Sequence, residues 1–151
     1  LDDEIDWLKI PDLEMDLIAY IPEVELKTKA ARDVLPKSYS NVEATLASSI
    51  SNLTAAALVS GDYELAGKMM EKDRFHEPYR KHLIPNYDLI KSTAKKLGAY
   101  GTVISGAGPT MMSFAPTGTS EKIVNHFQSK LLDYRILPLK VAKEGSIVKA
   151  K

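Results

Sequence analysis

The sequence contains no cysteine among its 151 residues. Disulfide bonds, thiol nucleophiles and cysteine-ligated zinc sites are therefore excluded. Disulfides are rare in reducing compartments, so a chain without cysteine suits the cytoplasm, which we expect as its location.

An excess of charge of either sign is also missing. The 20 lysine and arginine residues balance the 20 aspartate and glutamate residues, so no global field draws the chain to a polyanion. The opening stretch LDDEIDWLKIPDLEMD is acidic and has no long apolar run, which argues against a signal peptide. No later stretch suggests a membrane span. We therefore expect no nucleic acid and no membrane as partners.

An initiator methionine is absent as well, because the sequence begins at Leu1. Such a chain is either processed or part of a longer protein, and we favour the second explanation. Its length and its 44% of hydrophobic residues suit one domain that buries a core without disulfides. We find no internal repeat or linker, and so expect a single domain over residues 1–151.

The hydrophobic periodicity that is present predicts an α+β fold. Short apolar runs rich in β-formers predict strands at residues 16–25, 100–105, 110–115 and 135–142. Helical spacing and cap signals predict helices at residues 28–34, 40–60 and 63–72, and others that begin near residues 78, 85 and 119. Because strands and helices do not alternate, we expect an antiparallel or mixed sheet of about four strands, with helices packed on one face. Pro138 places the last strand at a sheet edge, or at a point where the ladder does not need its N–H.

Local signals bound the helix at residues 40–60. Ser40 and Glu43 match a capping box at its start. Gly61 is expected to end it and Asp62 to cap the next helix. Its apolar residues recur at helical spacing and predict one apolar face, formed by Val42, Leu46, Ile50, Leu53 and Ala57.

The stretch ISGAGPTMMSF, residues 104–114, places two glycines and a proline between two predicted strands. One interpretation is a four-residue hairpin loop, Gly106 to Pro109, in which glycine supplies a positive φ. The other is a phosphate-binding loop. A Walker A loop is excluded because Pro109 and Thr110 stand where Gly-Lys-Ser/Thr is needed, and a dinucleotide fingerprint is excluded because Met111 replaces its third glycine.

The longer run GAYGTVISGAGPT, residues 98–110, resembles the third, C-terminal motif of the GHMP kinases. In that family this loop lies in the cleft, near the phosphates and the nucleotide-binding glycine loop of the other domain. The resemblance implies a ferredoxin-like C-terminal domain, which agrees with the α+β prediction. It also makes Ser105, Gly106, Ala107 and Gly108 a phosphate-side loop, where bare backbone N–H groups suit an anion.

Two further stretches resemble the homoserine kinases within this family. PEVELKTKAARDVLP, residues 22–36, matches their pattern P-x-x-x-x-x-T-x-x-A-R-x-x-L-P, and DRFHEPYRKHLIP, residues 73–85, matches D-x-x-x-x-P-Y-R-x-x-L-I-P. The resemblance spans nearly the whole chain. It implies the C-terminal domain of an enzyme that transfers the γ-phosphoryl group of ATP to the hydroxyl of L-homoserine, giving O-phospho-L-homoserine in threonine biosynthesis.

The resemblance also implies a substrate site. Arg32 and Arg80 take its carboxylate-binding positions, and the arginine fork suits a carboxylate. Thr28 lies one helical turn before Arg32 and is implied to line the site near the reacting hydroxyl; the catalytic residue is otherwise unknown. Taken singly, each arginine would pass for a surface residue and Thr28 for a helix N-cap.

Other polar residues near these motifs have simpler interpretations. His76 and His82 lack the four-residue spacing of a zinc motif, and Mg²⁺ prefers oxygen ligands, so we expect no metal ligand among them. Tyr79 is expected to pack. For Asp73 and Glu77 we expect capping or ion pairing, with a carboxylate pair for acid–base chemistry as the alternative.

The family's ATP phosphate loop, roughly P-x-x-x-G-L-G-S-S-A, is absent from the sequence. In the family that loop and the Mg²⁺ carboxylate belong to the N-terminal domain. The resemblance therefore implies that ATP and Mg²⁺ bind mainly to a missing N-terminal domain, the partner of this one. It also implies that the intact enzyme is a homodimer and that this chain alone is inactive. Two alternatives stay open: another GHMP kinase of the mevalonate or phosphomevalonate type, and a free-standing amino-acid-binding regulatory module.

Overall fold

The computed structural model describes residues 10–144. A four-stranded sheet has the order β2-β3-β1-β4, and all neighbouring strands are antiparallel. The strands are β1 (Asp16–Pro22), β2 (Gly101–Ile104), β3 (Met111–Ala115) and β4 (Tyr134–Lys140). The helices are α1 (Thr28–Asp33), α2 (Asn41–Ser60), α3 (Tyr63–Met70), α4 (Glu77–Arg80), the 3-10 helix η1 (Lys81–Leu83), α5 (Tyr87–Lys96) and α6 (Ser120–Gln128). The α+β, ferredoxin-like prediction is confirmed.

Strands β4 and β2 form the two edges of this sheet. Pro138 lies on β4 and faces Ile18 of β1. An edge strand tolerates proline because only one of its sides has to supply ladder hydrogen bonds. The predicted edge position of Pro138 is confirmed.

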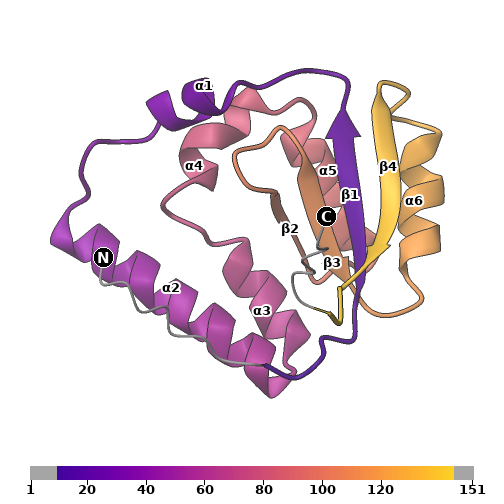
Figure 1. Ribbon diagram of the computed structural model, residues 1–151, viewed down its shortest axis with the longest axis horizontal. Coiled ribbons are helices and arrows are strands. Elements are labelled where there is room, and N and C mark those ends of the chain that lie inside the picture. The colour runs from indigo at the N-terminus through magenta and orange to yellow at the C-terminus, as the bar shows by residue number, and fades with distance from the viewer. Residues whose placement is uncertain (1–9, 145–151) are drawn as a thin grey trace, which may run out of the picture.

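Helices α5 and α6 cover one face of the sheet (Figure 1). The core between them and the strands includes several large side chains that are fully buried: Ile18, Tyr20, Ile90, Met111, Ile123 and Phe127. The Tyr20 and Phe127 rings meet edge to face with centroids 5.0 Å apart, a favourable geometry for aromatic pairs. The Tyr20 hydroxyl bonds Ser113 Oγ at 2.9 Å, so its burial leaves no polar atom unpaired, and that burial raises the pKa of Tyr20.

A buried carboxylate joins β1 to the start of α6. Asp16 is 1% exposed and accepts hydrogen bonds from the backbone N–H groups of Gly118 and Ser120, at 2.9 and 3.0 Å, and from Lys140. Burial alone would raise the pKa of Asp16, but Lys140 and these N–H groups outweigh it and hold the pKa below its ordinary range. Helix α6 thus begins on a cap supplied by a distant strand.

Helix α2 begins and ends where the local signals predict. Ser40 and Glu43 form the capping box, and Gly61 adopts a left-handed φ of 78° at the C-cap. The Asp62 carboxylate then accepts the N–H of Leu65 at 3.0 Å and caps α3.

The predicted apolar face of α2 is only partly buried. Ala57 is 2% exposed, but the exposed fractions of Val42, Leu46 and Leu53 are 69%, 45% and 43%. Figure 1 shows part of the reason: the first turns of α2, which include Val42 and Leu46, extend away from the rest of the domain, whereas its C-terminal half lies along α3. Leu53 belongs to that half and is still exposed.

By length and composition alone, helix α2 is long and apolar enough to cross a membrane, contrary to the expectation that no segment could do so. Core helices of soluble proteins pass the same test, and a single such helix is weak evidence for a membrane. Little of α2 is buried within the part of the chain that the structure describes.

Candidate functional site

The glycine stretch is the tip of the β2–β3 hairpin. The N–H of Ser105 donates to the carbonyl of Thr110 at 2.9 Å, and the N–H of Gly108 donates to Ser105 at 3.1 Å. Gly106 and Gly108 have φ values of 60° and 83°, a region that favours glycine. The loop covers residues 105–110, one residue more at each end than predicted, because the paired strands stop at Ile104 and Met111.

The tip of this loop presents backbone donors. Among residues 10–144, the N–H groups of Gly106 and Ala107 have no backbone or side-chain acceptor, and Gly106 is exposed. Adjacent unpaired N–H groups suit an anion. A strand, not a helix, follows the loop, so it lacks the helix N-terminus of a P-loop.

Arg80 ties this loop to helix α1. Its Nε donates to the carbonyl of Ala31 at 2.9 Å, and its Nη1 donates to the carbonyl of Gly106 at 3.2 Å. Arg80 is 8% exposed, so it is not the surface residue that its type alone would suggest. A guanidinium has five N–H groups. Two are used here, and the other three have no acceptor within residues 10–144.

Thr28 and Arg32 lie on α1, beside this attachment point. Thr28 is the first residue of the helix, and the N-cap is Lys27, so Thr28 is not itself the cap. Ala31 is fully buried, whereas Thr28 and Arg32 are exposed. The structure therefore brings together α1, Arg80 and the glycine loop, three segments that the sequence predicts to share a site.

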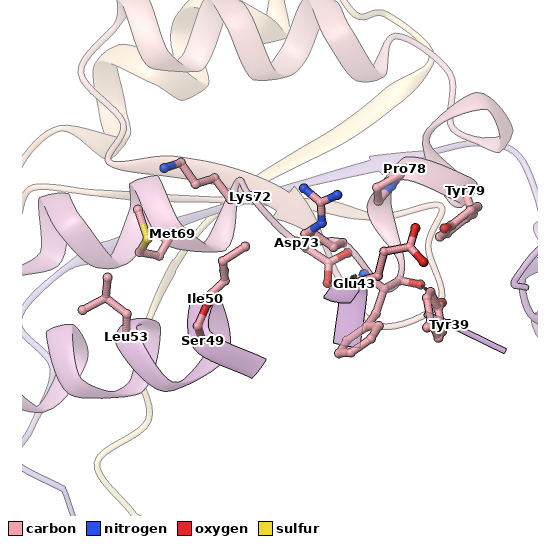
Figure 2. A pocket seen from close by; sticks show the side chains of 12 residues that line it. Tyr39, Glu43, Ser49, Ile50, Leu53, Met69, Lys72, Asp73, Pro78 and Tyr79 are labelled. Atoms are coloured by element: carbon pink, nitrogen blue, oxygen red, sulfur yellow. Dashed lines mark hydrogen bonds between the residues drawn. The ribbon is translucent and has the colours of Figure 1, made fainter. Parts of the chain in front are cut away.

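Two cavities open beside α2. The smaller, about 490 Å³, reaches from Thr54 of α2 to Glu77, Ile104 and Gly106. The larger, about 710 Å³, lies between the first half of α2 and residues 69–79 (Figure 2). Only the smaller one touches the glycine loop, at Gly106, and neither cavity is lined by Thr28, Arg32 or Arg80.

The two carboxylates near α4 have backbone partners. The Asp73 carboxylate accepts the N–H groups of His76 at 2.7 Å and of Glu77 at 2.6 Å, and so caps α4. Burial alone would raise the pKa of Asp73, but these N–H groups hold it below its ordinary value. Glu77 accepts the N–H of Ile104 at 2.6 Å. Both arrangements favour the capping interpretation over acid–base chemistry.

The remaining polar residues of this region are two histidines and Tyr79, of which His76 lines the smaller cavity and Tyr79 the larger. His76 pairs with Asp73 at 3.3 Å and is exposed, as is His82. Tyr79 packs against Tyr39 with ring centroids 6.3 Å apart, in agreement with the packing prediction. Within residues 10–144, no group of three His, Asp or Glu side chains could hold a metal ion, and we assign no metal ligand there.

Sequence reasoning missed the role of Glu71. Its carboxylate accepts the N–H of Thr102 on β2 at 3.0 Å. It also missed that Gly67 of α3 meets Gly101 of β2 in backbone contact. Periodicity does not show such contacts, because they join residues about thirty positions apart.

The fold and the loop define a class of protein. The family model described as "GHMP kinases C terminal" matches residues 54–132, more than half of the chain. The chain therefore belongs to the GHMP kinase family.

Its relatives are homoserine kinases. The homoserine kinase of Oceanobacillus iheyensis is 49% identical over 147 residues, which is 96% of this chain and 50% of that protein. The homoserine kinase of Bacillus licheniformis is 41% identical over 99% of this chain and 49% of that protein. The chain thus spans about half the length of the curated relatives it matches.

Solved structures of kinases of this family share the fold of the chain. The crystal structure of homoserine kinase from Cytophaga hutchinsonii matches 89% of this chain and 44% of that one, with a TM-score of 0.77 and 29% identity. The mevalonate kinase of L. major has a TM-score of 0.61 at 14% identity. This second likeness shows the fold alone.

Proposed function

We propose that this chain is the C-terminal half of a homoserine kinase, which transfers the γ-phosphoryl group of ATP to the hydroxyl of L-homoserine. The observation that carries the proposal is Arg80, which joins the motif on α1 to the glycine loop through the carbonyls of Ala31 and Gly106. A phosphoryl acceptor and the phosphates have to meet in one place, and these are the two segments that the homoserine kinase motifs assign to them.

The substrate carboxylate is proposed to bind Arg32 and the unused N–H groups of Arg80. A charge-assisted hydrogen bond of this kind contributes about 1.5–3 kcal/mol. Thr28, one turn before Arg32, lines the same side of α1, near the reacting hydroxyl. The loop residues Ser105, Gly106, Ala107 and Gly108 then close over the phosphates, where the free N–H groups at the loop tip stabilise negative charge.

ATP and Mg²⁺ are proposed to be held mainly by an N-terminal half that this chain lacks. Its relatives are about twice as long, and the described residues offer no cluster of metal ligands. Phosphoryl transfer depends on positioning and charge neutralisation, so each half would supply part of the cleft. We also propose that the enzyme is cytoplasmic and that it forms a homodimer.

Substrate competition with the full-length protein tests the proposal. We expect ATP-dependent phosphorylation of L-homoserine and not of mevalonate, and no turnover by the 151-residue chain above a no-enzyme control. A preference for mevalonate would support the other GHMP kinase type. Tight binding of homoserine or threonine to the chain alone, without any effect of ATP, would support the regulatory module.

A further inference from the structure

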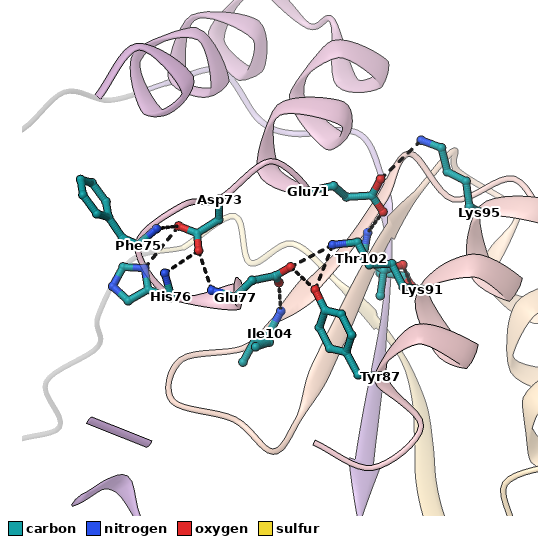
Figure 3. A network of polar contacts seen from close by, with 11 residues as sticks. Glu71, Asp73, Phe75, His76, Glu77, Tyr87, Lys91, Lys95, Thr102 and Ile104 are labelled. Carbon is teal, nitrogen blue, oxygen red and sulfur yellow. Dashed lines mark hydrogen bonds and ion pairs between the residues drawn. The ribbon is translucent and has the colours of Figure 1, made fainter. Parts of the chain in front are cut away.

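The outer edge of strand β2 is covered by two glutamates. β2 is an edge strand, and the N–H groups of Thr102 and Ile104 point away from β3. Glu71 Oε1 accepts the first at 3.0 Å and Glu77 Oε1 accepts the second at 2.6 Å (Figure 3). Unpaired edge donors are a liability, so each carboxylate satisfies one of them.

Glu77 is held much more firmly than Glu71. The Glu77 side chain is 8% exposed, and its Oε2 accepts hydrogen bonds from the Tyr87 hydroxyl and from Lys91 Nζ, the latter at 2.9 Å. Its own backbone N–H is bound by Asp73. The carboxylate is thus fixed from α5 on one side and from β2 on the other.

Glu71 has a looser setting. Its side chain is 19% exposed, and its ion pair with Lys95 spans 4.0 Å. It also holds β2 two residues farther from the loop than Glu77 does. The chain therefore contains a matched pair of edge-covering glutamates that differ in their distance from the glycine loop.

Helix α4 holds the hairpin at two points. Glu77 at its start binds Ile104, the last residue of β2 before the loop, and Arg80 at its end binds Gly106 at the loop tip. Arg80 also binds α1. A four-residue helix therefore determines where the loop lies relative to the substrate-binding segment.

We propose that Glu77 is a positioning residue that sets the place of the phosphate-side loop. It acts through Ile104 and does not touch the substrate, because its two oxygens already accept hydrogen bonds from Ile104, Tyr87 and Lys91. The proposal rests on the proposed function. A displacement of roughly 1 Å in a group that positions a reacting phosphoryl lowers the reaction rate about 100-fold.

The test compares Glu77→Gln with Glu71→Gln in the full-length enzyme. Glutamine keeps the size of the side chain but replaces one acceptor oxygen with a donor. If its oxygen still accepts from Ile104, its NH2 group faces the Lys91 ammonium, which cannot accept, so the side chain has to shift or give up the bond from Ile104. We expect Glu77→Gln to lower kcat about 10- to 100-fold while the KM for homoserine stays within about twofold. Glu71→Gln should leave kcat within about twofold. Equal losses of kcat in both variants, or an unchanged kcat in Glu77→Gln, would overturn the proposal.

A second readout does not depend on the reaction. Amide hydrogen exchange in the full-length protein should become faster in Glu77→Gln at Ile104, Ser105 and Gly108, whose N–H groups are hydrogen-bonded. In Glu71→Gln it should become faster at the start of β2 but not in the loop. Tyr87→Phe, which removes one partner of Glu77 and keeps the ring, should give an intermediate increase at the same loop residues. Unchanged loop exchange in Glu77→Gln overturns the positioning role even if the wild-type enzyme phosphorylates another substrate. Faster loop exchange in an enzyme that does not use homoserine overturns only the proposed function.

Discussion

Arg32 and Arg80 have the same implied role, yet their surroundings differ. Arg32 is exposed on α1. Arg80 is buried and bound to two backbone carbonyls. In the proposed site Arg32 would therefore act only on the ligand, whereas Arg80 also links α1 to the glycine loop.

This difference predicts two kinetic signatures in the full-length enzyme. Arg32→Ala should raise the KM for homoserine about tenfold or more, the loss of one charge-assisted bond, without a change in the melting temperature. Arg80→Ala should raise the KM, lower kcat and lower stability by about 1–3 kcal/mol, because the carbonyls of Ala31 and Gly106 lose their donors. Steady-state kinetics and thermal unfolding measure both, with Lys29→Ala as the control on α1. An unchanged KM in either arginine variant would remove that residue from the site.

At the scale of elements, helix α3 lies so close to strand β2 that neither Gly67 nor Gly101 leaves room for a side chain. A Cβ placed on Gly67 would lie 2.4 Å from the carbonyl carbon and oxygen of Tyr100, and one on Gly101 would lie 2.5 Å from the oxygen of Gly67. Only glycine fits at both positions. Because Glu71 directly follows α3, this close approach also places its carboxylate at the edge of β2.

Gly67→Ala should therefore force α3 away from β2. We expect a loss of stability of about 1–3 kcal/mol, the usual range for overpacking, since the opposing atoms belong to the backbone and cannot rotate away. Denaturant unfolding measures it. Lys68→Ala, an exposed neighbour on the same helix, should have little effect. Equal stability of the two variants would show that α3 shifts without strain.

The junction of β1 and α6 predicts a pH dependence. The pKa of Asp16 is lower in the folded protein than its ordinary value, which is about 3.9. Its ionised form therefore stabilises the fold above that value, and this stabilisation is lost as the pH falls below it. Asp16→Ala should lower stability at pH 7 by about 1–3 kcal/mol, because two partly buried N–H groups lose their acceptor.

Thermal unfolding at several pH values would measure this effect. The difference between wild type and Asp16→Ala should be constant from pH 7 to about pH 5 and shrink below about pH 4. Asp133→Ala, at an exposed aspartate, is the control. A difference that grows on acidification would contradict the assigned role.

At the scale of the whole molecule, α2 looks like part of a larger protein. It has one charged residue, Glu43, in twenty, and Val42, Leu46 and Leu53 are largely exposed. A helix without a charged face is normally covered on more than one side. We propose that the N-terminal half of the proposed kinase covers it.

A double substitution, Leu46→Ser with Leu53→Ser, should have opposite effects in the two contexts. In the 151-residue chain it should reduce aggregation, because it removes exposed apolar area. In the full-length protein it should lower stability by about 2 kcal/mol or more, because the same side chains would be buried. Light scattering and denaturant unfolding measure these outcomes, with Ser48→Ala as the control on another side of α2. If the double substitution leaves the stability of the full-length protein unchanged, the N-terminal half does not cover Leu46 and Leu53.

Much of the fold follows from local signals. The capping box of Ser40 and Glu43, the left-handed Gly61 and the edge proline Pro138 lie where predicted. The prediction for the sides of α2 was less accurate. Helical spacing finds an apolar face, but it does not show which part of that face another element covers.

The candidate site also has features that the sequence predicts and features that only the packing of distant segments decides. The motifs on α1, on α4 and at the glycine loop were recognised from the sequence, and the structure places them together. The partners of Arg80 and Glu77 were not predictable, because their hydrogen bonds join residues 49, 26 and 27 positions apart. Whether Thr28, Arg32 and Arg80 bind a substrate stays a prediction.

The sequence by itself determined the order of the elements, the two ends of α2, the family and the hairpin form of the glycine loop, because caps, prolines, glycines and motifs act within a few residues of each other. Only the tertiary structure decided that Arg80 is buried between α1 and the loop, that two glutamates cover the edge of β2 and that the apolar face of α2 is only partly covered. These features depend on which backbone donors and acceptors a distant segment can reach, and packing alone brings those segments together.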